Sequence, residues 1–240
     1  TEYTDQGFGP VILMLHGWGG SLHGFDLLVP NLATVHRVIR LDLPGIGGTE
    51  APSETWNLDN YIDFVKSFIQ KLDLKVEVLV GHSFGGRIAI KGLTTKNLTA
   101  DQLILIGSAG LAKSQTLRNL ILKSLTKIGN LISYLPPFIF WRRQLKRKLY
   151  RAIGSDYLDA GVLRQTYLKI IAEDLSLIAP NVSVPTLLIW GAEDVTTPLT
   201  DGRRLASLIP HSQLEIIKDT DHDVHQEKPE SVIELINKFL

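Results

Sequence analysis

The chain has 240 residues, of which 44% are hydrophobic and 21% are charged, and its formal net charge is zero. This length predicts one globular domain with room for an inserted subdomain, and the balanced charge gives no overall attraction to nucleic acid. The absence of cysteine excludes disulfides and thiolate metal sites.

The sequence contains neither a signal peptide nor an apolar run long enough to cross a membrane. We therefore expect a cytoplasmic protein with no integral membrane association. The first residue is Thr1 rather than methionine, which leaves a removed leader open.

Short apolar runs alternate along the chain with helical patterns, two of which cover residues 60–72 and 83–93. Because the runs are apolar on both faces, they predict parallel strands covered by helices on each side. Right-handed crossovers bring the carboxyl ends of such strands to one edge of the sheet, where ligands bind. The predicted strands are residues 11–15, 35–41, 76–80, 103–106, 186–190 and 214–217.

A glycine-rich loop, residues 16–20 with the sequence His-Gly-Trp-Gly-Gly, follows the first of these strands. A loop at this edge can bring a backbone N–H, here that of Trp18, next to a reacting group. It lacks the strand–helix spacing and the following acidic residue of a dinucleotide site. We expect the indole of Trp18 to form part of the wall of a substrate pocket.

Ser83 is at the centre of a Gly-His-Ser-Phe-Gly sequence that joins the third predicted strand to a helix. A strand, a sharp turn and a helix are the context in which this motif forms a nucleophile elbow. Gly81 and Gly85 remove side chains that would collide across the turn, and the helix N-terminus directs N–H groups at a developing anion. We predict that Ser83 is a nucleophile; the alternative is an ordinary glycine-rich turn.

The alternation of strands and helices stops between about residues 111 and 179, where apolar residues recur at helical spacing. We predict an all-helical insert here, a cap over the active-site edge. The core then consists of residues 1–110 and 180–240. Phe138 and Trp141 in the cap are expected to contact substrate, together with Trp18 and Phe84.

The predicted cap is basic, since residues 102–155 contain no Asp or Glu. One interpretation is a solvated helix face. The other is a lid that attracts an anionic partner, such as an acidic carrier protein or an anionic membrane surface. The basic residues are Lys113, Arg118, Lys123, Lys127, Arg142, Arg143, Lys146, Arg147, Lys148 and Arg151.

Two further candidate residues follow the last two predicted strands. A nucleophilic serine needs a base and an acid that orients the base. Asp194 is predicted as the acid and His222 as the base, with Glu193 a surface carboxylate and His225 the competing base. The chain order is therefore Ser83, Asp194, His222.

No group of His, Asp and Glu residues has the spacing of metal ligands in the sequence. His222 and His225 are three positions apart, but no third ligand is near them in the chain. We therefore expect no metal and no other cofactor.

Together these segments resemble the α/β-hydrolase fold superfamily, and within it serine esterases and lipases with a helical cap, in which nucleophile, acid and histidine follow the same order. The resemblance implies a mostly parallel central sheet with helices on both faces. It also implies that Ser83 attacks a small-molecule carboxylic ester, with the N–H groups of Trp18 and Phe84 as the oxyanion hole. His16 is expected to support the oxyanion loop.

The resemblance leaves several activities open: hydrolysis of thioesters, lactones or carbon–carbon bonds, and ligand binding by a hydrolase-like receptor. Amide hydrolysis of the proline iminopeptidase type is less expected, because such enzymes carry acidic residues in the cap. The loop at His16 and the basic cap are similar to those of pimeloyl-acyl-carrier-protein methyl ester esterases. We expect a monomer or a weak homodimer.

The chain departs from the family pattern in two places. Asp221 precedes His222, where relatives usually have glycine, and this could tilt the turn or add a charge near the base. Only ten residues precede Val11, so the first strand of the fold is expected to be missing or trimmed.

Overall fold

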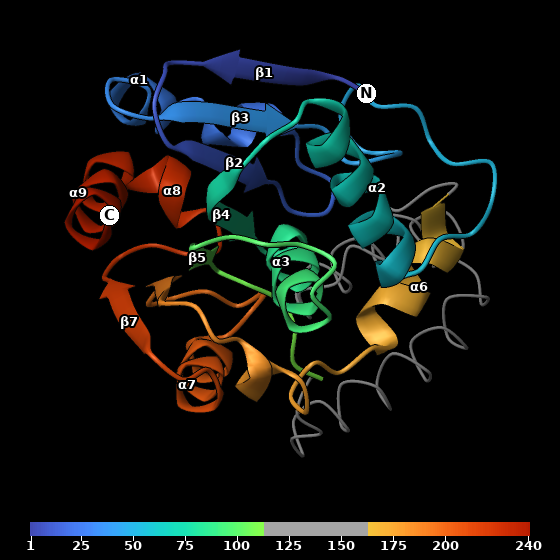
Figure 1. Ribbon diagram of the computed structural model, residues 1–240. Coiled ribbons are helices and arrows are strands. Elements are labelled where there is room, and N and C mark those ends of the chain that lie inside the picture. Colours follow the sequence, from blue (N-terminus) through green and yellow to red (C-terminus); the bar gives the residue numbers. More distant parts are fainter. Residues whose placement is uncertain (113–162) are drawn as a thin grey trace, which may run out of the picture.

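The computed structural model describes residues 1–112 and 163–240, and a single sheet forms the centre of this part of the chain (Figure 1). Its strand order is β1-β3-β2-β4-β5-β6-β7. Neighbouring strands pair in parallel, except that β1 runs antiparallel to β3. The strands are β1 (Tyr3–Gln6), β2 (Val11–Leu15), β3 (Arg37–Leu41), β4 (Val76–His82), β5 (Gln102–Ile106), β6 (Thr186–Gly191) and β7 (Ser212–Ile217).

The strands expected from the sequence are all present, but β1 corrects the expectation that the first strand is missing. Its residues are largely exposed, so it has no apolar run to reveal it in the sequence. Backbone pairing with β3 holds it at the sheet edge, helped by an ion pair of 2.7 Å between Arg37 and Asp5.

The helices are α1 (Val29–Leu32), α2 (Leu58–Lys71), α3 (Phe84–Thr94), α6 (Arg164–Ala172), α7 (Leu199–Leu208), α8 (Val224–Glu227) and α9 (Pro229–Phe239), with short 3-10 turns η1 (Leu22–Phe25) and η5 (Ala179–Asn181). α2 begins with a reciprocal capping box between Asn57 and Asn60, and this explains its start at Leu58. Among the described residues, no helix combines the length and apolar character needed to cross a membrane.

Two apolar cores lie on opposite faces of the sheet. Alternate residues of β2 show the division: Leu13 and Leu15 pack in the core that includes α2, α3 and α7, whereas Ile12 and Met14 pack in the core that includes α1 and α9. Both faces of the central strands are therefore buried, as expected for a parallel sheet between two helical layers. This burial gives the strands a rigid carboxyl edge on which loops can be positioned.

Residues 113–162, which contain most of the predicted cap, lie outside the described residues, so the domain boundaries stay predictions. The described end of the predicted all-helical insert includes the helix α6. Arg87 on α3 donates hydrogen bonds to the carbonyls of Ile170 (3.0 Å) and Glu173 (2.7 Å). Lys91, one turn later, forms an ion pair with the Glu173 carboxylate at 2.6 Å. These contacts attach the C-terminal end of α6 to the helix that follows Ser83.

We predict that Ile104→Ala lowers the free energy of unfolding by about 2–5 kcal/mol, because it leaves a cavity in a fully buried position of β5. Leu177→Ala is the matched control: this side chain is 88% exposed, so a change within about 0.5 kcal/mol is expected. Urea unfolding followed by circular dichroism measures both. Equal losses in the two variants would contradict the assignment of the core.

Candidate active site

Ser83 occupies a strained turn between β4 and α3. Its backbone has φ 49° and ψ −107°, a conformation that L-residues seldom adopt. The turn is held from both sides, because Ser83 N–H donates to the Ile106 carbonyl (3.0 Å) and its carbonyl accepts from Gly86 (3.1 Å) and Ala109 (3.0 Å). The strain is therefore maintained by β5 and by the loop that follows it.

The glycines on either side of Ser83 are required by close backbone contacts. A Cβ at Gly85 would lie 2.0 Å from the Leu15 carbonyl oxygen, and one at Gly81 would lie 2.6 Å from Gly86. No side chain fits at these separations without moving α3 away from the sheet. The predicted collision across the turn is confirmed for Gly81, whereas Gly85 is required by the close approach of Leu15 in β2.

Asp194 and His222 are brought together from the loops after β6 and β7. The Nδ1 of His222 lies 2.8 Å from Oδ2 of Asp194, whose side chain is completely buried. The other oxygen, Oδ1, accepts the backbone N–H groups of Thr196 and Thr197, both at 2.8 Å. The carboxylate of Asp194 thus accepts several hydrogen bonds, and His222 presents Nδ1 to it, which leaves Nε2 as the nitrogen that can accept a proton.

Thr197 is a site residue that the sequence reasoning missed. Its hydroxyl lies 2.8 Å from Oδ2 of Asp194, 3.2 Å from Nδ1 of His222 and 2.9 Å from the Gly107 carbonyl. The spacing of Asp194 and Thr197 could have revealed this contact in the sequence. An Asp followed three positions later by Thr is typical of a side chain that caps its own loop. Glu193 is exposed, as predicted.

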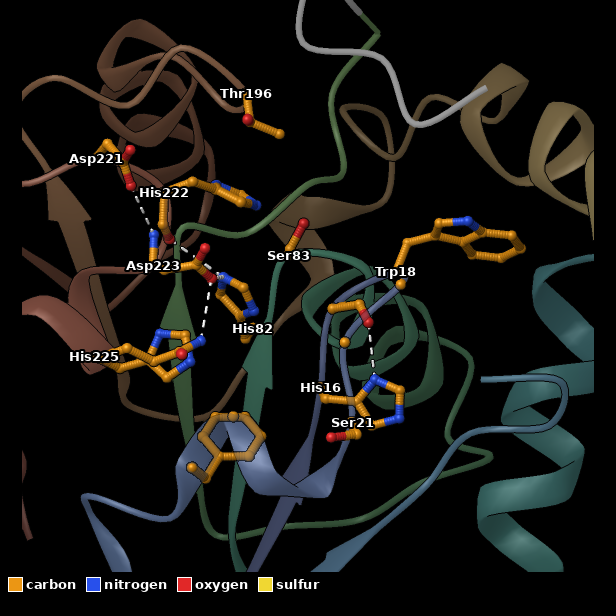
Figure 2. A pocket seen from close by; sticks show the side chains of 16 residues that line it. His16, Trp18, Ser21, His82, Ser83, Thr196, Asp221, His222, Asp223 and His225 are labelled. Carbon is orange, nitrogen blue, oxygen red and sulfur yellow. Dashed lines mark hydrogen bonds and ion pairs between the residues drawn. The ribbon is translucent and has the colours of Figure 1, made fainter. Parts of the chain in front are cut away.

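Ser83 and His222 line the same cavity, which has a volume of about 390 Å³. Figure 2 shows the imidazole of His222 extending toward Ser83 across this cavity. Trp18 also lines it, on the opposite side of Ser83. The predicted nucleophile and the predicted base therefore line one cavity.

Phe84 does not line this cavity. Its ring is buried and packs edge to face against Trp18, at 5.3 Å between ring centroids, and against Tyr61, at 5.0 Å. The side chain thus belongs to the core, and only the backbone of Phe84 lies at the elbow. Phe138 and Trp141, the other predicted substrate contacts, lie outside the described residues.

The predicted oxyanion loop contains His16, which is buried and hydrogen-bonded at both ring nitrogens. Nδ1 of His16 lies 2.8 Å from the Gly17 carbonyl, and Nε2 accepts the Leu43 N–H at 2.9 Å, so the proton is on Nδ1. Burial lowers the pKa of His16 and keeps it neutral. The His16 carbonyl in turn accepts the Gly85 N–H at 3.1 Å, which links the loop directly to the elbow.

The two predicted oxyanion donors, Trp18 and Phe84, lie on the two segments that this hydrogen bond joins. Within residues 1–112 and 163–240, the backbone N–H groups of Trp18 and Phe84 have no hydrogen-bond acceptor. Donors left without a partner beside a nucleophile are the arrangement that stabilises a developing oxyanion. Their role stays a prediction.

Asp221, which replaces the usual glycine before His222, pairs with Glu227. Its N–H lies 3.3 Å from a Glu227 carboxylate oxygen. A hydrogen bond between the two side chains lowers the pKa of Asp221 and raises that of Glu227. The additional carboxylate thus has a partner on α8, although it also lines the cavity that contains His222.

Next to the catalytic candidates lies a group of residues that could hold a metal ion and that spacing in the sequence did not indicate. His82, from the elbow, lies against His225, with 4.4 Å between ring centroids, and Asp223 is beside both. One ligand atom from each of the three lies within 4.8 Å of the others. The sequence does not indicate this group, because His82 is far from Asp223 and His225 along the chain. His225 does not contact Asp194, which favours His222 as the base.

Comparison with known proteins shows the family and the fold of the chain. The model of the alpha/beta hydrolase family matches residues 12–235. A monoacylglycerol lipase from Bos taurus is 28% identical over 98% of this chain and 76% of its own length. A 2-hydroxymuconate semialdehyde hydrolase from Pseudomonas sp. (strain CF600) is 25% identical over 100% of this chain and 90% of its own length. A solved meta-cleavage product hydrolase from Pseudomonas fluorescens IP01 is 25% identical over 99% of this chain and 92% of its own, with TM-score 0.74.

The strain at Ser83 predicts that Ser83→Gly is more stable than Ser83→Ala by about 1 kcal/mol. Relief of about 1–3 kcal/mol of backbone strain exceeds the 0.5–1 kcal/mol that glycine loses through the freedom of the unfolded chain. Thermal unfolding of the two variants gives the difference. Ala206→Gly in α7 provides the control, since there the same exchange should destabilise by about 1 kcal/mol. A lower stability for Ser83→Gly would mean that the turn is not strained.

Proposed function

Because the chain belongs to the alpha/beta hydrolase family, we propose that this hydrolase cleaves carboxylic esters through an acyl-enzyme intermediate on Ser83. The observation that carries the proposal is the 2.8 Å contact between His222 and the buried Asp194, in a cavity that Ser83 shares with His222. A base oriented by a buried acid and placed beside an elbow serine is the arrangement needed for acyl transfer.

In the first half of the proposed reaction, Oγ of Ser83 attacks the ester carbonyl and its proton passes to Nε2 of His222. Asp194 stabilises the resulting imidazolium and keeps Nδ1–H directed toward itself. The negative charge on the former carbonyl oxygen is stabilised by the N–H groups of Trp18 and Phe84. Each such donor is worth about 10²- to 10³-fold in kcat.

The tetrahedral intermediate then breaks its bond to the alkoxy group, which leaves as an alcohol after taking the proton from His222. In the second half, His222 removes a proton from water, and the hydroxide adds to the acyl carbon. Collapse of this second intermediate returns the proton to Ser83 and releases the carboxylic acid. The chemistry requires no group beyond these side chains and water.

The choice of an ester is supported by the likeness to a monoacylglycerol lipase. A second candidate is hydrolysis of a carbon–carbon bond in a diketone, because the named relatives include a 2-hydroxymuconate semialdehyde hydrolase and a meta-cleavage product hydrolase. Both reactions use the same serine, histidine and acid, so the difference depends on the substrate pocket rather than on the triad.

We expect Ser83→Ala to lower kcat for a nitrophenyl ester by about 10⁵- to 10⁶-fold, and Asp194→Asn by about 10⁴-fold with little change in KM. The asparagine cannot hold His222 in the reactive tautomer. Steady-state kinetics on folded variants measures both. Asp219→Asn is the control, because this carboxylate is 86% exposed and outside the cavity. A Ser83→Ala enzyme that retains more than a few per cent of the wild-type rate would overturn the nucleophile assignment.

Substrate class is tested with neutral, anionic and carrier-linked esters and a meta-cleavage diketone, each at two salt concentrations. We expect multiple turnovers on the neutral ester. If the basic segment attracts anionic partners, salt should depress kcat/KM only for the charged esters. Changing Arg142, Arg143, Lys146 and Arg147 to glutamate should have the same selective effect. Faster turnover of the diketone would favour the carbon–carbon reaction, and a stall after one turnover would indicate a ligand-binding receptor.

A further inference from the structure

His82, Asp223 and His225 converge from two parts of the chain next to the proposed active site. His82 is the residue before Ser83, at the end of β4, whereas Asp223 and His225 belong to the start of α8. Nε2 of His82 lies 3.7 Å from Oδ1 of Asp223. All three line the cavity that contains Ser83 and His222, as Figure 2 shows.

Both histidines of the group are buried, and the nitrogens of neutral imidazole rings are common metal ligands. Nδ1 of His225 is buried and has no hydrogen-bond partner among the described residues. An unsatisfied buried nitrogen of this kind costs free energy unless something binds it.

The carboxylates around the cluster give it a negative potential. Asp221 and Asp223 line the cavity, and Asp194 lies behind His222. A cation next to Asp223 would be attracted by these acidic side chains.

We propose that His82, Asp223 and His225 form a binding site for a divalent transition-metal ion of the Zn²⁺ type. Two imidazoles and one carboxylate are ligands that Zn²⁺ prefers, and the cavity leaves room for water in the fourth position. The side chain of Asp223 is 53% exposed, so it can move to shorten the present separations of up to 4.8 Å. Mg²⁺ and Ca²⁺ prefer oxygen ligands and should not compete.

The bound ion is expected to inhibit turnover, an effect that rests on the proposed function. Nε2 of His82 now lies 3.2 Å from the His222 carbonyl, and coordination through this nitrogen would replace that contact. The rings of His82 and His222 are only 4.9 Å apart, so a 2+ charge at His82 also disfavours the imidazolium that His222 must form. A bound metal ion would thus inhibit the transfer of a proton to His222.

The test is titration of tag-free, chelator-treated protein with ZnCl₂ in a calorimeter, with Ser83→Ala protein in parallel. We expect one Zn²⁺ per chain in both and no binding of Mg²⁺. Asp223→Asn and His225→Gln should each weaken binding at least about tenfold, since even outer-sphere partners are worth that much in metal affinity. Saturating Zn²⁺ should lower kcat/KM of the wild type at least about tenfold, reversibly with EDTA, and should affect Asp223→Asn far less.

His23→Gln and Asp219→Asn are the matched controls, because both residues are exposed and neither lines the cavity. Both should bind Zn²⁺ like the wild type. Because His225 is buried, its variant is checked for folding by thermal unfolding, and Asp223→Asn provides the test on an exposed side chain. No binding, or equal affinity in the wild type and Asp223→Asn, overturns the site. Zn²⁺ binding by a protein that hydrolyses no ester would leave the site intact and refute only the proposed function.

Discussion

The close packing of the elbow against β2 is the contact on which the rest of the site depends. Gly85 lies so near Leu15 that no Cβ fits between them, and its N–H donates to the His16 carbonyl at 3.1 Å. One glycine therefore fixes the distance between the strand that carries the oxyanion loop and the turn that carries Ser83. The positive φ of Ser83 is a consequence, because the chain must turn sharply there to enter α3 without leaving the sheet.

The acid is positioned by the core in a similar way. Trp190 is fully buried at the end of β6, and its indole N–H donates to the Thr197 carbonyl at 2.7 Å. Thr197 in turn contacts Asp194 through both its backbone and its hydroxyl. The indole of Trp190 thus helps to attach the loop that contacts His222 to the hydrophobic core. Buried polar groups that are fully satisfied specify one geometry, and this is what a base needs.

The polar part of the cavity has two charge environments. The predicted base His222 contacts the buried carboxylate of Asp194, whereas His82 and His225 are kept neutral by burial. The difference arises because Asp194 contacts only His222 among the three, and burial penalises the charged form of the other two imidazoles. Neutral histidines beside several carboxylates form a surface suited to a cation, and this surface is directly next to the base.

Local patterns in the sequence determined much of this protein. Apolar runs predicted the parallel strands, and the motif at residues 81–85 predicted the elbow. Both predictions were possible because each pattern consists of consecutive residues. The resemblance to a family added the order of Ser83, Asp194 and His222. Only the tertiary structure could decide what depends on contacts between distant segments. It revealed β1, whose exposed residues carry no apolar signal, and it directed the Phe84 ring into the core. It also brought His82 to Asp223 and His225, since proximity across the carboxyl edge of a sheet follows from strand order and not from separation along the chain.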